Sequence, residues 1–285
     1  MGRPGVEPLT NPDAASVAEW LDRWHLSVDG AVFQTATSTL APAHTATGQP
    51  VMLKLSHHEE ERRGAALLAA WSGRGAARVL EHDGDAVLLE RATGPRSLAE
   101  MSVSGLDADA TEVLCTTAGA LHGASGVVLA AANPPELVPL RTWFRELFAY
   151  ADELTPLHRR GVDLAVALLD DERDVVALHG DLHHANVLDF GERGWLAVDP
   201  KGLLGERTFE YASLCCNPTP TIALAPGRLE SRLAIVTDAA GLDSRRFTQW
   251  LVAWSALSST WHARSGDPVA AASVARIGEH AAGLL

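Results

Sequence analysis

The first ninety or so residues consist of short apolar runs separated by polar turns. Asn11-Pro12 has the form of an N-cap followed by a first-turn proline, and apolar residues recur at helical spacing from Val17 to Trp24, which predicts a helix over about residues 12–24. Short β-prone runs follow between Val28 and Leu55. The segment Glu59–Trp71 is rich in strong helix formers, and two more strands form a hairpin about Asp83-Gly84. The pattern predicts strands with one inserted helix.

After Gly94 the apolar spacing becomes helical, near residues 108–122, 141–152 and 155–169. Val175–Leu178 and the paired runs VLDF and WLAV are the only strands predicted in this part. Large apolar residues from Phe247 to Trp261 share one helix face, which is typical of a core; alternatively, Trp254 or Trp261 lines a pocket. The change of pattern places a boundary near residues 92–96.

Composition narrows the function classes. The chain has 285 residues, 47% of them hydrophobic, and a formal net charge of −13, as expected of a soluble globular protein. The negative charge argues against nucleic acid as a partner and favours a cationic ligand. We expect no membrane partner, because no apolar run approaches the length of a spanning helix, and the absence of a secretion signal favours the cytoplasm. The three cysteines are predicted to be buried apolar residues.

The stretch HGDLHHANVLDFGERGWLAVDPKG carries the candidate chemistry. A buried strand leads into the polar loop HGDLHHAN, and the following hairpin returns the chain to Asp199, so Asp181, Asn186 and Asp199 are predicted to converge. One carboxylate and one amide oxygen on a hard cation, with a second carboxylate free to receive a hydroxyl proton, is the arrangement used for phosphoryl transfer. The spacing of Asp, four residues and Asn matches the catalytic loop of kinases.

With these residues in view, the chain resembles the aminoglycoside phosphotransferase, or kinase-like, family. The resemblance rests on HGDLHHANVL, DPKGLLGE, LKLS and EERRGA, and within the family it is greatest to the streptomycin and hydroxyurea resistance kinases. It implies a two-lobed α+β fold, with a β-rich nucleotide-binding lobe over residues 1–91 and a mainly helical lobe over residues 92–285. It also implies transfer of the γ-phosphoryl of a magnesium nucleotide to a small-molecule hydroxyl, most simply as a streptomycin 6-type kinase that confers antibiotic resistance.

The resemblance also assigns roles to residues. Asp181 would be the catalytic base, and Asn186 and Asp199 would hold Mg²⁺ against the nucleotide phosphates. Lys54 would contact the α- and β-phosphates, held by an ion pair with Glu61, although Glu59 and Glu60 adjoin Glu61 and could exchange roles with it. His179 would brace the catalytic loop.

The remaining nucleotide contacts are less distinctive. A glycine-rich phosphate loop is missing, and the hydroxyls and backbone amides of Thr37, Ser38 and Thr39 either reach the phosphates in its place or form a plain polar turn. The backbone near Glu90, Arg91 and Ala92 would hold the base, and such main-chain contacts do not distinguish ATP from GTP.

For the acceptor, Glu206 and Glu210 are the candidates to face a cationic group, and the alternative for both is a solvated helix start. The histidines of HGDLHH, with His57 and His58, would suit zinc only if they shared one face, which their spacing does not favour.

Three rival functions remain. A protein kinase would carry DFG and an activation segment, whereas Pro-Lys-Gly follows Asp199. A non-catalytic binding protein would be expected to lose one of the four key residues Lys54, Asp181, Asn186 and Asp199, all of which are present. A kinase for hydroxyurea, a sugar or an amino sugar is the nearest rival, and the sequence leaves the acceptor and the oligomeric state open.

Overall fold

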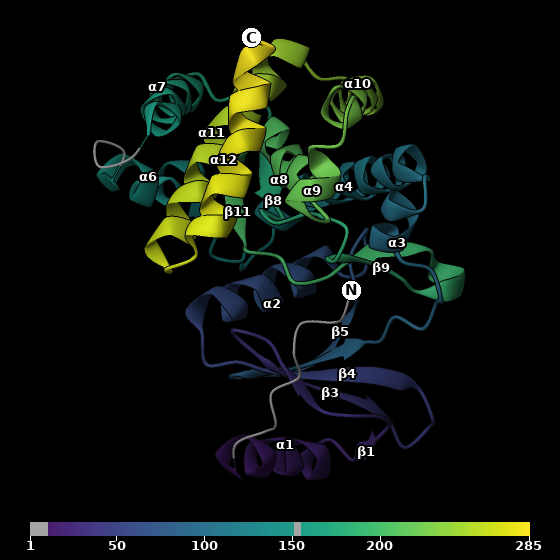
Figure 1. Ribbon diagram of the computed structural model, residues 1–285. Helices are drawn as coiled ribbons and strands as arrows, with labels where there is room; N and C mark the ends of the chain where they lie inside the picture. Colours follow the sequence, from purple (N-terminus) through teal and green to yellow (C-terminus); the bar gives the residue numbers. More distant parts are fainter. Residues whose placement is uncertain (1–10, 151–154) are drawn as a thin grey trace.

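The computed structural model describes residues 11–150 and 155–285. Its N-terminal part is a twisted antiparallel sheet in which five strands follow the order β1-β3-β4-β6-β5 and β2 pairs with β3 (Figure 1). The elements are α1 (Asn11–Arg23), β1 (Ser27–Val28), β2 (Phe33–Gln34), β3 (Thr39–His44), β4 (Pro50–Leu55), α2 (Glu59–Trp71), β5 (Val79–Asp83) and β6 (Ala86–Glu90).

This sheet lies between the two helices α1 and α2 (Figure 1). Strands β3 and β4 alternate between buried and half-buried positions, as strands with two different faces do. Val51, Leu53 and Leu55 pack with apolar residues of α1, whereas Met52 packs with the core on the α2 side. Lys54 follows the same alternation as Met52, so the sequence pattern of β4 directs it toward α2.

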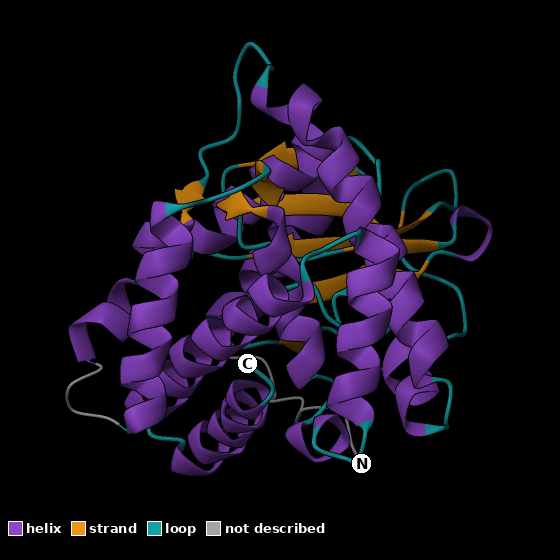
Figure 2. Cartoon of the chain, turned by 90° about the horizontal axis from the view of Figure 1, so that it is seen from above, coloured by secondary structure: helices purple, strands orange, loops and turns teal. Residues whose placement is uncertain are grey.

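The C-terminal part is mainly helical, and its helices overlie the strands when the molecule is seen from above (Figure 2). Its helices are α3 (Leu98–Val103), α4 (Asp107–Leu129), α5 (Leu140–Trp143), α6 (Arg145–Tyr150), α7 (Pro156–Asp170), η2 (Gly191–Arg193), η3 (Arg207–Tyr211), α8 (Ala212–Cys216), α9 (Pro220–Ala223), α10 (Arg228–Ala240), α11 (Ser244–Arg264) and α12 (Pro268–Gly283). Its strands are β7 (Val138–Pro139), β8 (Val175–Leu178), β9 (Val187–Asp189), β10 (Trp195–Ala197) and β11 (Leu203–Glu206).

Two strands and one helix break differ from the sequence prediction. Strands β7 and β11 were not predicted; β11 pairs antiparallel with β8 and parallel with β7. Their runs are short, and their stability comes from pairing with segments distant in sequence, which local propensity does not reveal. The helix predicted over residues 141–152 is divided into α5 and α6 at Phe144, and its last two positions lie outside the described residues.

Helix α11 is the centre of the C-terminal core. Trp250 is fully buried, with its ring 6.1 Å from that of Phe144 and 5.6 Å from that of Phe209. The cysteines Cys115, Cys215 and Cys216 are free and buried, as predicted. The predicted core role of this helix therefore holds for most of its length.

Helix α4 is long and apolar enough, by length and composition alone, to cross a membrane, contrary to the sequence estimate that no segment was. Its first residue, Asp107, forms an ion pair with the fully buried Arg232 of α10, at 2.6 Å from Nη2 to Oδ1. Residues such as Leu114, Ala118 and Leu121 are fully buried in the core. In this structure α4 is thus a core helix of the C-terminal part.

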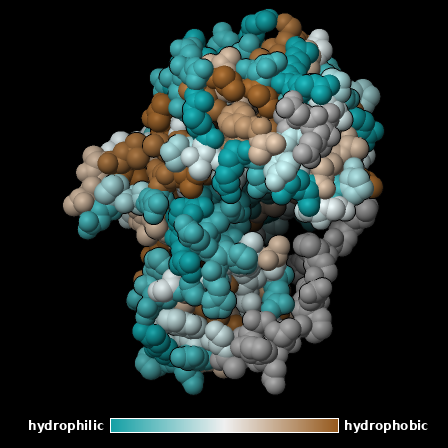
Figure 3. All heavy atoms as spheres, turned by 90° about the vertical axis from the view of Figure 1, so that its left-hand side faces the viewer, coloured by the Kyte–Doolittle hydropathy of each residue, from teal (hydrophilic) through white to brown (hydrophobic). Residues whose placement is uncertain are grey.

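The segment that connects the two parts packs against the β9–β10 hairpin. The backbone N–H of Gly94 donates to the carbonyl of Asp189 at 2.9 Å, and a Cβ on Gly94 would lie only 2.1 Å from the Asp189 carboxyl carbon. The Arg96 guanidinium donates to the same carboxylate at 2.7 and 3.0 Å. Figure 3 shows the molecule narrowing where the two parts meet. The segment 94–96 is therefore held against the β9–β10 hairpin.

Candidate active site

The predicted base and metal ligands come from one loop and one hairpin. Asp181 and Asn186 lie in the loop between β8 and β9, and Asp199 follows β10 with a φ of 63°, a left-handed conformation uncommon outside glycine. The Asn186 side-chain N–H₂ donates to the Asp181 carbonyl at 2.8 Å and to the Asp181 carboxylate at 3.3 Å. Because its nitrogen is used in this way, the amide oxygen of Asn186 is the atom left to bind a cation.

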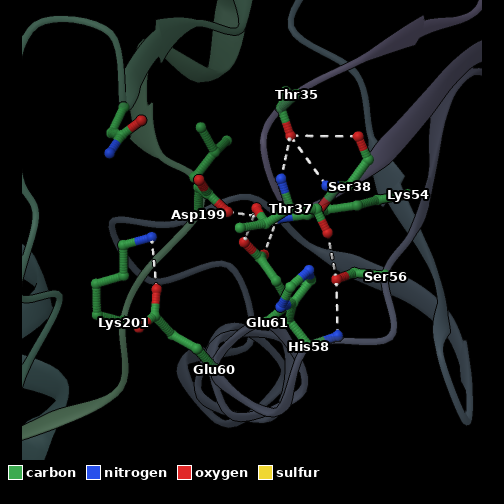
Figure 4. Close-up of polar contacts among 12 residues, drawn as sticks. Thr35, Thr37, Ser38, Lys54, Ser56, His58, Glu60, Glu61, Asp199 and Lys201 are labelled. Atoms are coloured by element: carbon green, nitrogen blue, oxygen red, sulfur yellow. Dashed lines mark hydrogen bonds and ion pairs between the residues drawn. The ribbon is translucent and has the colours of Figure 1, made fainter. Parts of the chain in front are cut away.

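Lys54 connects the N-terminal sheet to this loop. Its Nζ donates to Glu61 Oε2 at 2.5 Å and also to Asp199 Oδ1 (Figure 4). The structure thus selects Glu61 from the three adjacent glutamates, because Glu59 pairs with Arg63 and Glu60 with Lys201. The Lys54 side chain is 15% exposed, so the exposed-strand alternative does not apply.

A glycine lets α2 approach the Asp199 loop. A Cβ on Gly64 would lie 2.2 Å from the carbonyl oxygen of Pro200, so only glycine fits there without a backbone shift. This close contact brings Glu60 and Glu61, which precede Gly64 on α2, within reach of both lysines. Within the EERRGA segment, the glycine thus allows the close packing and the glutamates supply the ion pairs.

The ionisation states suit the roles. Burial raises the pKa of Asp199, but Lys54 outweighs it and leaves the carboxyl below its usual range. Burial likewise opposes ionisation of Asp181, and His183, with its Nε2 3.6 Å away, together with Lys201 brings its pKa below the usual value. Both carboxylates are therefore charged at neutral pH, one able to hold a metal ion and the other able to accept a proton.

His179 contacts the backbone of the loop that carries Asp181. Its ring lies 2.8 Å, through Nε2, from the carbonyl oxygen of Val198, and its Nδ1 accepts the Asp181 N–H at 3.3 Å. The ring is fully buried and stacks on Trp71 at 6.4 Å between centroids. Burial is the main reason that its pKa falls below the ordinary histidine value, so a neutral imidazole orients the loop backbone.

Glu210 does not face an acceptor, and its assignment from the sequence is wrong. It lies in η3, is 1% exposed, and accepts the backbone N–H groups of His179 and Gly180 at 2.7 and 2.8 Å. It also lies 3.4 Å from His122 Nε2. Its carboxylate therefore supports the catalytic loop from behind.

Glu206 is a second correction. It is the last residue of β11, is 1% exposed, and pairs with Arg246 at 2.7 and 2.5 Å. The backbone N–H of Arg173 donates to it at 3.2 Å. Neither the acceptor role nor the solvated helix start applies, because the unpredicted strand β11 carries this residue into the interior.

A cavity of about 300 Å³ lies between the two parts, beside Lys54, Asn186 and Asp199. Its apolar lining includes Met52, Leu89 and Phe190, and the chain segment from Glu90 to Ala92 also borders it. The Glu90 side chain itself accepts the Arg78 N–H at 2.6 Å and an ion pair from Arg193, so only its backbone is available to a ligand.

The hydroxyl-rich turn meets this cavity through a residue other than those expected. Thr35 lines it, whereas Ser38 and Thr39 are buried and absent from its lining. Thr37 Oγ1 donates to Glu61 Oε1 at 2.5 Å, and Thr35 Oγ1 accepts the Ser38 N–H at 3.1 Å (Figure 4). The side chains of this turn thus hold Glu61 and the turn itself.

A second cavity of about 520 Å³ opens beside Asp181, lined by residues of the C-terminal part and by Glu60 of α2. Trp143, Trp254 and Trp261 line it, so the two tryptophans for which a pocket position was the alternative to a core position do border a cavity. The rings of Trp143 and Trp261 meet edge to face at 5.3 Å. Glu146 also lines the cavity, and its carboxylate lies 3.5 Å from Arg264 Nε.

Sequence reasoning missed Glu146, Asn217, His262 and Lys201 as lining residues of this cavity. They come from four separate segments, and no local spacing connects them. Of the lining residues, the sequence marked Asp181 through its loop motif, and Trp254 and Trp261 through their shared helix face. Across the described ranges, no group of three or more His, Cys, Asp or Glu side chains could hold a metal ion. Asp199 and Asn186 would supply only two ligands, and phosphates and water would fill the other positions, as Mg²⁺ prefers.

The chain is similar in sequence to known kinases. Residues 23–266 match the family described as aminoglycoside/hydroxyurea antibiotic resistance kinase. A streptomycin 3''-kinase of Klebsiella pneumoniae is 44% identical over 251 residues, which is 86% of this chain and 92% of the relative. A streptomycin 6-kinase of Streptomyces griseus is 33% identical over 88% of this chain and 83% of its own, and a hydroxyurea phosphotransferase of Kitasatospora aureofaciens is 32% identical over 93% and 76%.

Solved structures share the fold at low identity. An amicoumacin kinase in complex with AMP-PNP, Ca²⁺ and its ligand superposes with a TM-score of 0.67 at 12% identity, covering 95% of this chain and 96% of its own. An aminoglycoside phosphotransferase bound to AMP-PNP and hygromycin B gives a TM-score of 0.65 at 12% identity, covering 93% and 97%. The expected two-lobed kinase-like α+β architecture is confirmed.

Proposed function

The chain belongs to the aminoglycoside/hydroxyurea antibiotic resistance kinase family, and we propose that it phosphorylates streptomycin with ATP and Mg²⁺. The observation that carries the proposal is the cavity of about 520 Å³ beside Asp181, lined by three tryptophans and Glu146. Streptomycin carries guanidinium groups, which stack on aromatic rings and pair with carboxylates. Residues 1–91 would form the nucleotide-binding lobe and residues 92–285 the catalytic and acceptor-binding lobe.

In this proposal Asp181 accepts the proton of the attacking hydroxyl and orients its oxygen. Glu210 and His179 keep the loop backbone beside Asp181 fixed, through bonds to the N–H groups of His179 and Gly180 and to the Val198 carbonyl. Lys54, steadied by Glu61, offers its ammonium to the nucleotide phosphates. Pre-positioning of these groups accounts for most of the catalysis expected in phosphoryl transfer.

The residues present fit a metal nucleotide. Asn186 and Asp199 offer one amide and one carboxylate oxygen beside Lys54, and the cavity of about 300 Å³ offers apolar walls for a base. Mg²⁺, when bound there, would neutralise charge on the transferring phosphoryl group. Ser38, Thr39 and the Glu61 side chain would act on the nucleotide only indirectly, through the turn and through Lys54.

The hydroxyl modified is proposed to be the 3''-hydroxyl rather than the 6-hydroxyl expected from the sequence. The 3''-kinase relative is 44% identical, against 33% for the 6-kinase of Streptomyces griseus. A cavity of about 520 Å³ with a carboxylate and three indole rings is far larger than hydroxyurea requires and favours a bulky cation over that rival. We place the reaction in the cytoplasm, with a cationic small molecule as the acceptor.

The test is phosphorylation by the purified enzyme with magnesium ATP and with GTP, against streptomycin, hydroxyurea and a neutral sugar. The expected result is turnover of streptomycin, with the new phosphate assigned to the 3''-oxygen by phosphorus–proton correlation NMR. Phosphate on the 6-oxygen would overturn the regiochemistry alone. Turnover of hydroxyurea or the sugar, without streptomycin, would overturn the acceptor while leaving the kinase.

Glu146→Gln tests whether this cavity binds a cationic acceptor. One charge-assisted contact contributes about 1.5 to 3 kcal/mol, so the KM for streptomycin should rise roughly ten- to hundredfold with kcat and nucleotide affinity nearly constant. Glu112→Gln, an exposed site on α4 away from the cavity lining, is the matched control. An unchanged KM in Glu146→Gln would remove this carboxylate from acceptor binding.

A further inference from the structure

Lysine is almost absent from this chain. Of its 23 Lys and Arg residues, only Lys54 and Lys201 are lysines. Every other ion pair found within the described ranges uses arginine or histidine as its cation. Lysine differs from arginine in presenting a compact, strongly hydrated point charge. Both lysines lie where the two parts of the chain meet, and the proposed chemistry has so far used only Lys54.

Lys201 is built into the catalytic loop region. Its backbone N–H donates to the His179 carbonyl at 2.7 Å, and a Cβ on Gly180 would lie 3.3 Å from Lys201 Cβ. Its side chain is 19% exposed and lines the acceptor cavity together with Asp181. Its Nζ lies 3.0 Å from Glu60 Oε1, and Figure 4 shows this pair beside the Lys54–Glu61 pair, with both glutamates leaving α2.

The two lysines lie at different cavities. Lys54 borders the nucleotide cavity and Lys201 borders the acceptor cavity. Asp199 contacts Lys54 directly and precedes Lys201 by two residues. The other non-histidine cation of the acceptor cavity, Arg145, is exposed and donates to the Thr142 carbonyl at 3.4 Å. Lys201 is therefore the cation beside the base on the side toward which the phosphoryl group must move.

We propose that Lys201 is a catalytic residue that leaves Glu60 and binds the non-bridging oxygens of the phosphoryl group during transfer. The proposal rests on the proposed kinase function. In the transfer, the bond from the γ-phosphorus to the bridging oxygen breaks, and ADP retains the electron pair. The bond from phosphorus to the acceptor oxygen forms, and the hydroxyl proton passes to Asp181. Lys201 keeps its own proton throughout and stabilises the charge that spreads over the equatorial oxygens.

A structural role makes a different prediction. Glu60 belongs to the N-terminal part and Lys201 to the C-terminal part, so their ion pair also connects the two. If Lys201 served only as that connection, removing either partner would have the same effect. The pair Lys201→Met and Glu60→Gln therefore separates catalysis from connection.

The kinetic experiment compares Lys201→Met, Lys201→Arg and Glu60→Gln with the wild type. Loss of one donor to developing charge costs on the order of 100-fold or more, so Lys201→Met should lose this much kcat with nucleotide affinity unchanged. Glu60→Gln removes a partly exposed ion pair and one carboxylate at the border of the acceptor cavity, so it is expected to act on the acceptor KM and to keep kcat within about fivefold. Lys201→Arg retains the charge and should recover at least about tenfold of the lost kcat.

A second readout does not depend on the acceptor. Labelling lysine side chains with ¹⁵N gives two signals in this chain, and Lys201→Arg assigns them. Addition of ADP, Mg²⁺ and aluminium fluoride, which mimics the transferring phosphoryl group, should shift the Lys201 signal, whereas ADP and Mg²⁺ alone should shift mainly that of Lys54. The mimic should also bind Lys201→Met at least about tenfold more weakly, with ADP affinity unchanged.

The outcomes distinguish this proposal from the acceptor assignment. If the wild type fails to phosphorylate streptomycin, the acceptor is wrong, and Lys201 is still tested by the labelled signals and by ADP release to water. Equal loss of kcat in Lys201→Met and Glu60→Gln would show a connecting role and overturn the proposal. If the Lys201 signal does not shift when the phosphoryl mimic is added, the proposal is overturned as well. This measurement on the wild type remains valid if Lys201→Met fails to fold.

Discussion

Replacing Glu210 with glutamine tests the reassignment of this residue from the acceptor to the catalytic loop. The carboxylate accepts N–H groups of His179 and Gly180 at 2.7 and 2.8 Å in a fully buried setting. Burial raises the pKa of Glu210, but the neighbouring His122 and these bonds outweigh it and leave the pKa below its usual value. The native group is therefore an ionised acceptor of at least two hydrogen bonds.

The cost follows from the chemistry of the substitution. An amide keeps one acceptor oxygen and turns an N–H₂ group toward the second backbone N–H. One charge-assisted bond of about 1.5 to 3 kcal/mol is lost and one buried donor is left unpaired, so destabilisation of about 3 kcal/mol or more is expected. At roughly 2 to 4 °C per kcal/mol for a domain of this size class, the Tm should fall by about 6 to 12 °C.

The assay combines thermal unfolding with steady-state kinetics. Because Gly180 adjoins Asp181, a displaced loop should lower kcat while leaving the KM for the acceptor nearly constant. Glu230→Gln is the matched control, since Glu230 is 47% exposed, pairs with His280, and should change stability by no more than about 0.5 kcal/mol. An unchanged Tm with a raised acceptor KM in Glu210→Gln would refute the buried role and restore the acceptor assignment.

Three further predictions concern the base, a buried ion pair and a close approach. Asp181→Asn should retain nucleotide binding and lose on the order of 100-fold or more in kcat, whereas Asp199→Asn should weaken magnesium-nucleotide binding in a calorimetric titration; the reverse pattern would exchange their roles. Burial opposes ionisation of Asp107, but Arg232 and Ser102 lower its pKa on balance, so its stabilising effect is present above the unfolded pKa of about 3.9 and is lost as the pH falls below it. Asp107→Asn should therefore flatten the acid side of a stability–pH profile, and an unaltered slope would contradict this. Gly64→Ala places a Cβ 2.2 Å from the Pro200 carbonyl and should lower both Tm and nucleotide affinity, whereas Gly123→Ala, on α4 with nothing within 4 Å, should be neutral or slightly stabilising.

Local pattern was sufficient for much of the fold. The helix predicted over Glu59–Trp71 and the strand over Val175–Leu178 match α2 and β8 at both ends, because strong propensity and flanking turn residues define them within a few positions. The short strand β11 was not predicted, because it is held by pairing with β8 and β7 rather than by its own four residues.

The candidate site divides in the same way. Asp181, Asn186 and Asp199 are brought together by the spacing within HGDLHHAN and by the hairpin that follows it. All three lie close together in the sequence, so their convergence could be predicted from the sequence alone. The partner of Lys54 could not be chosen among three adjacent glutamates, because a rotation of about 100° per residue around α2 decides which one faces the sheet.

By itself, the sequence determined most of the helices and strands, the class of chemistry and the motif that brings Asp181, Asn186 and Asp199 together, since these depend on neighbours along the chain. Only the tertiary structure decided which carboxylates are free. Glu206 and Glu210 have acidic side chains in a favourable place in the sequence, yet burial obliges each to satisfy protein donors. Glu146 and Lys201, from α6 and the Asp199 loop, meet at the acceptor cavity because packing of helices distant in sequence creates that space. A charged side chain can bind a ligand only if protein groups do not already occupy it, and packing between distant segments decides whether they do.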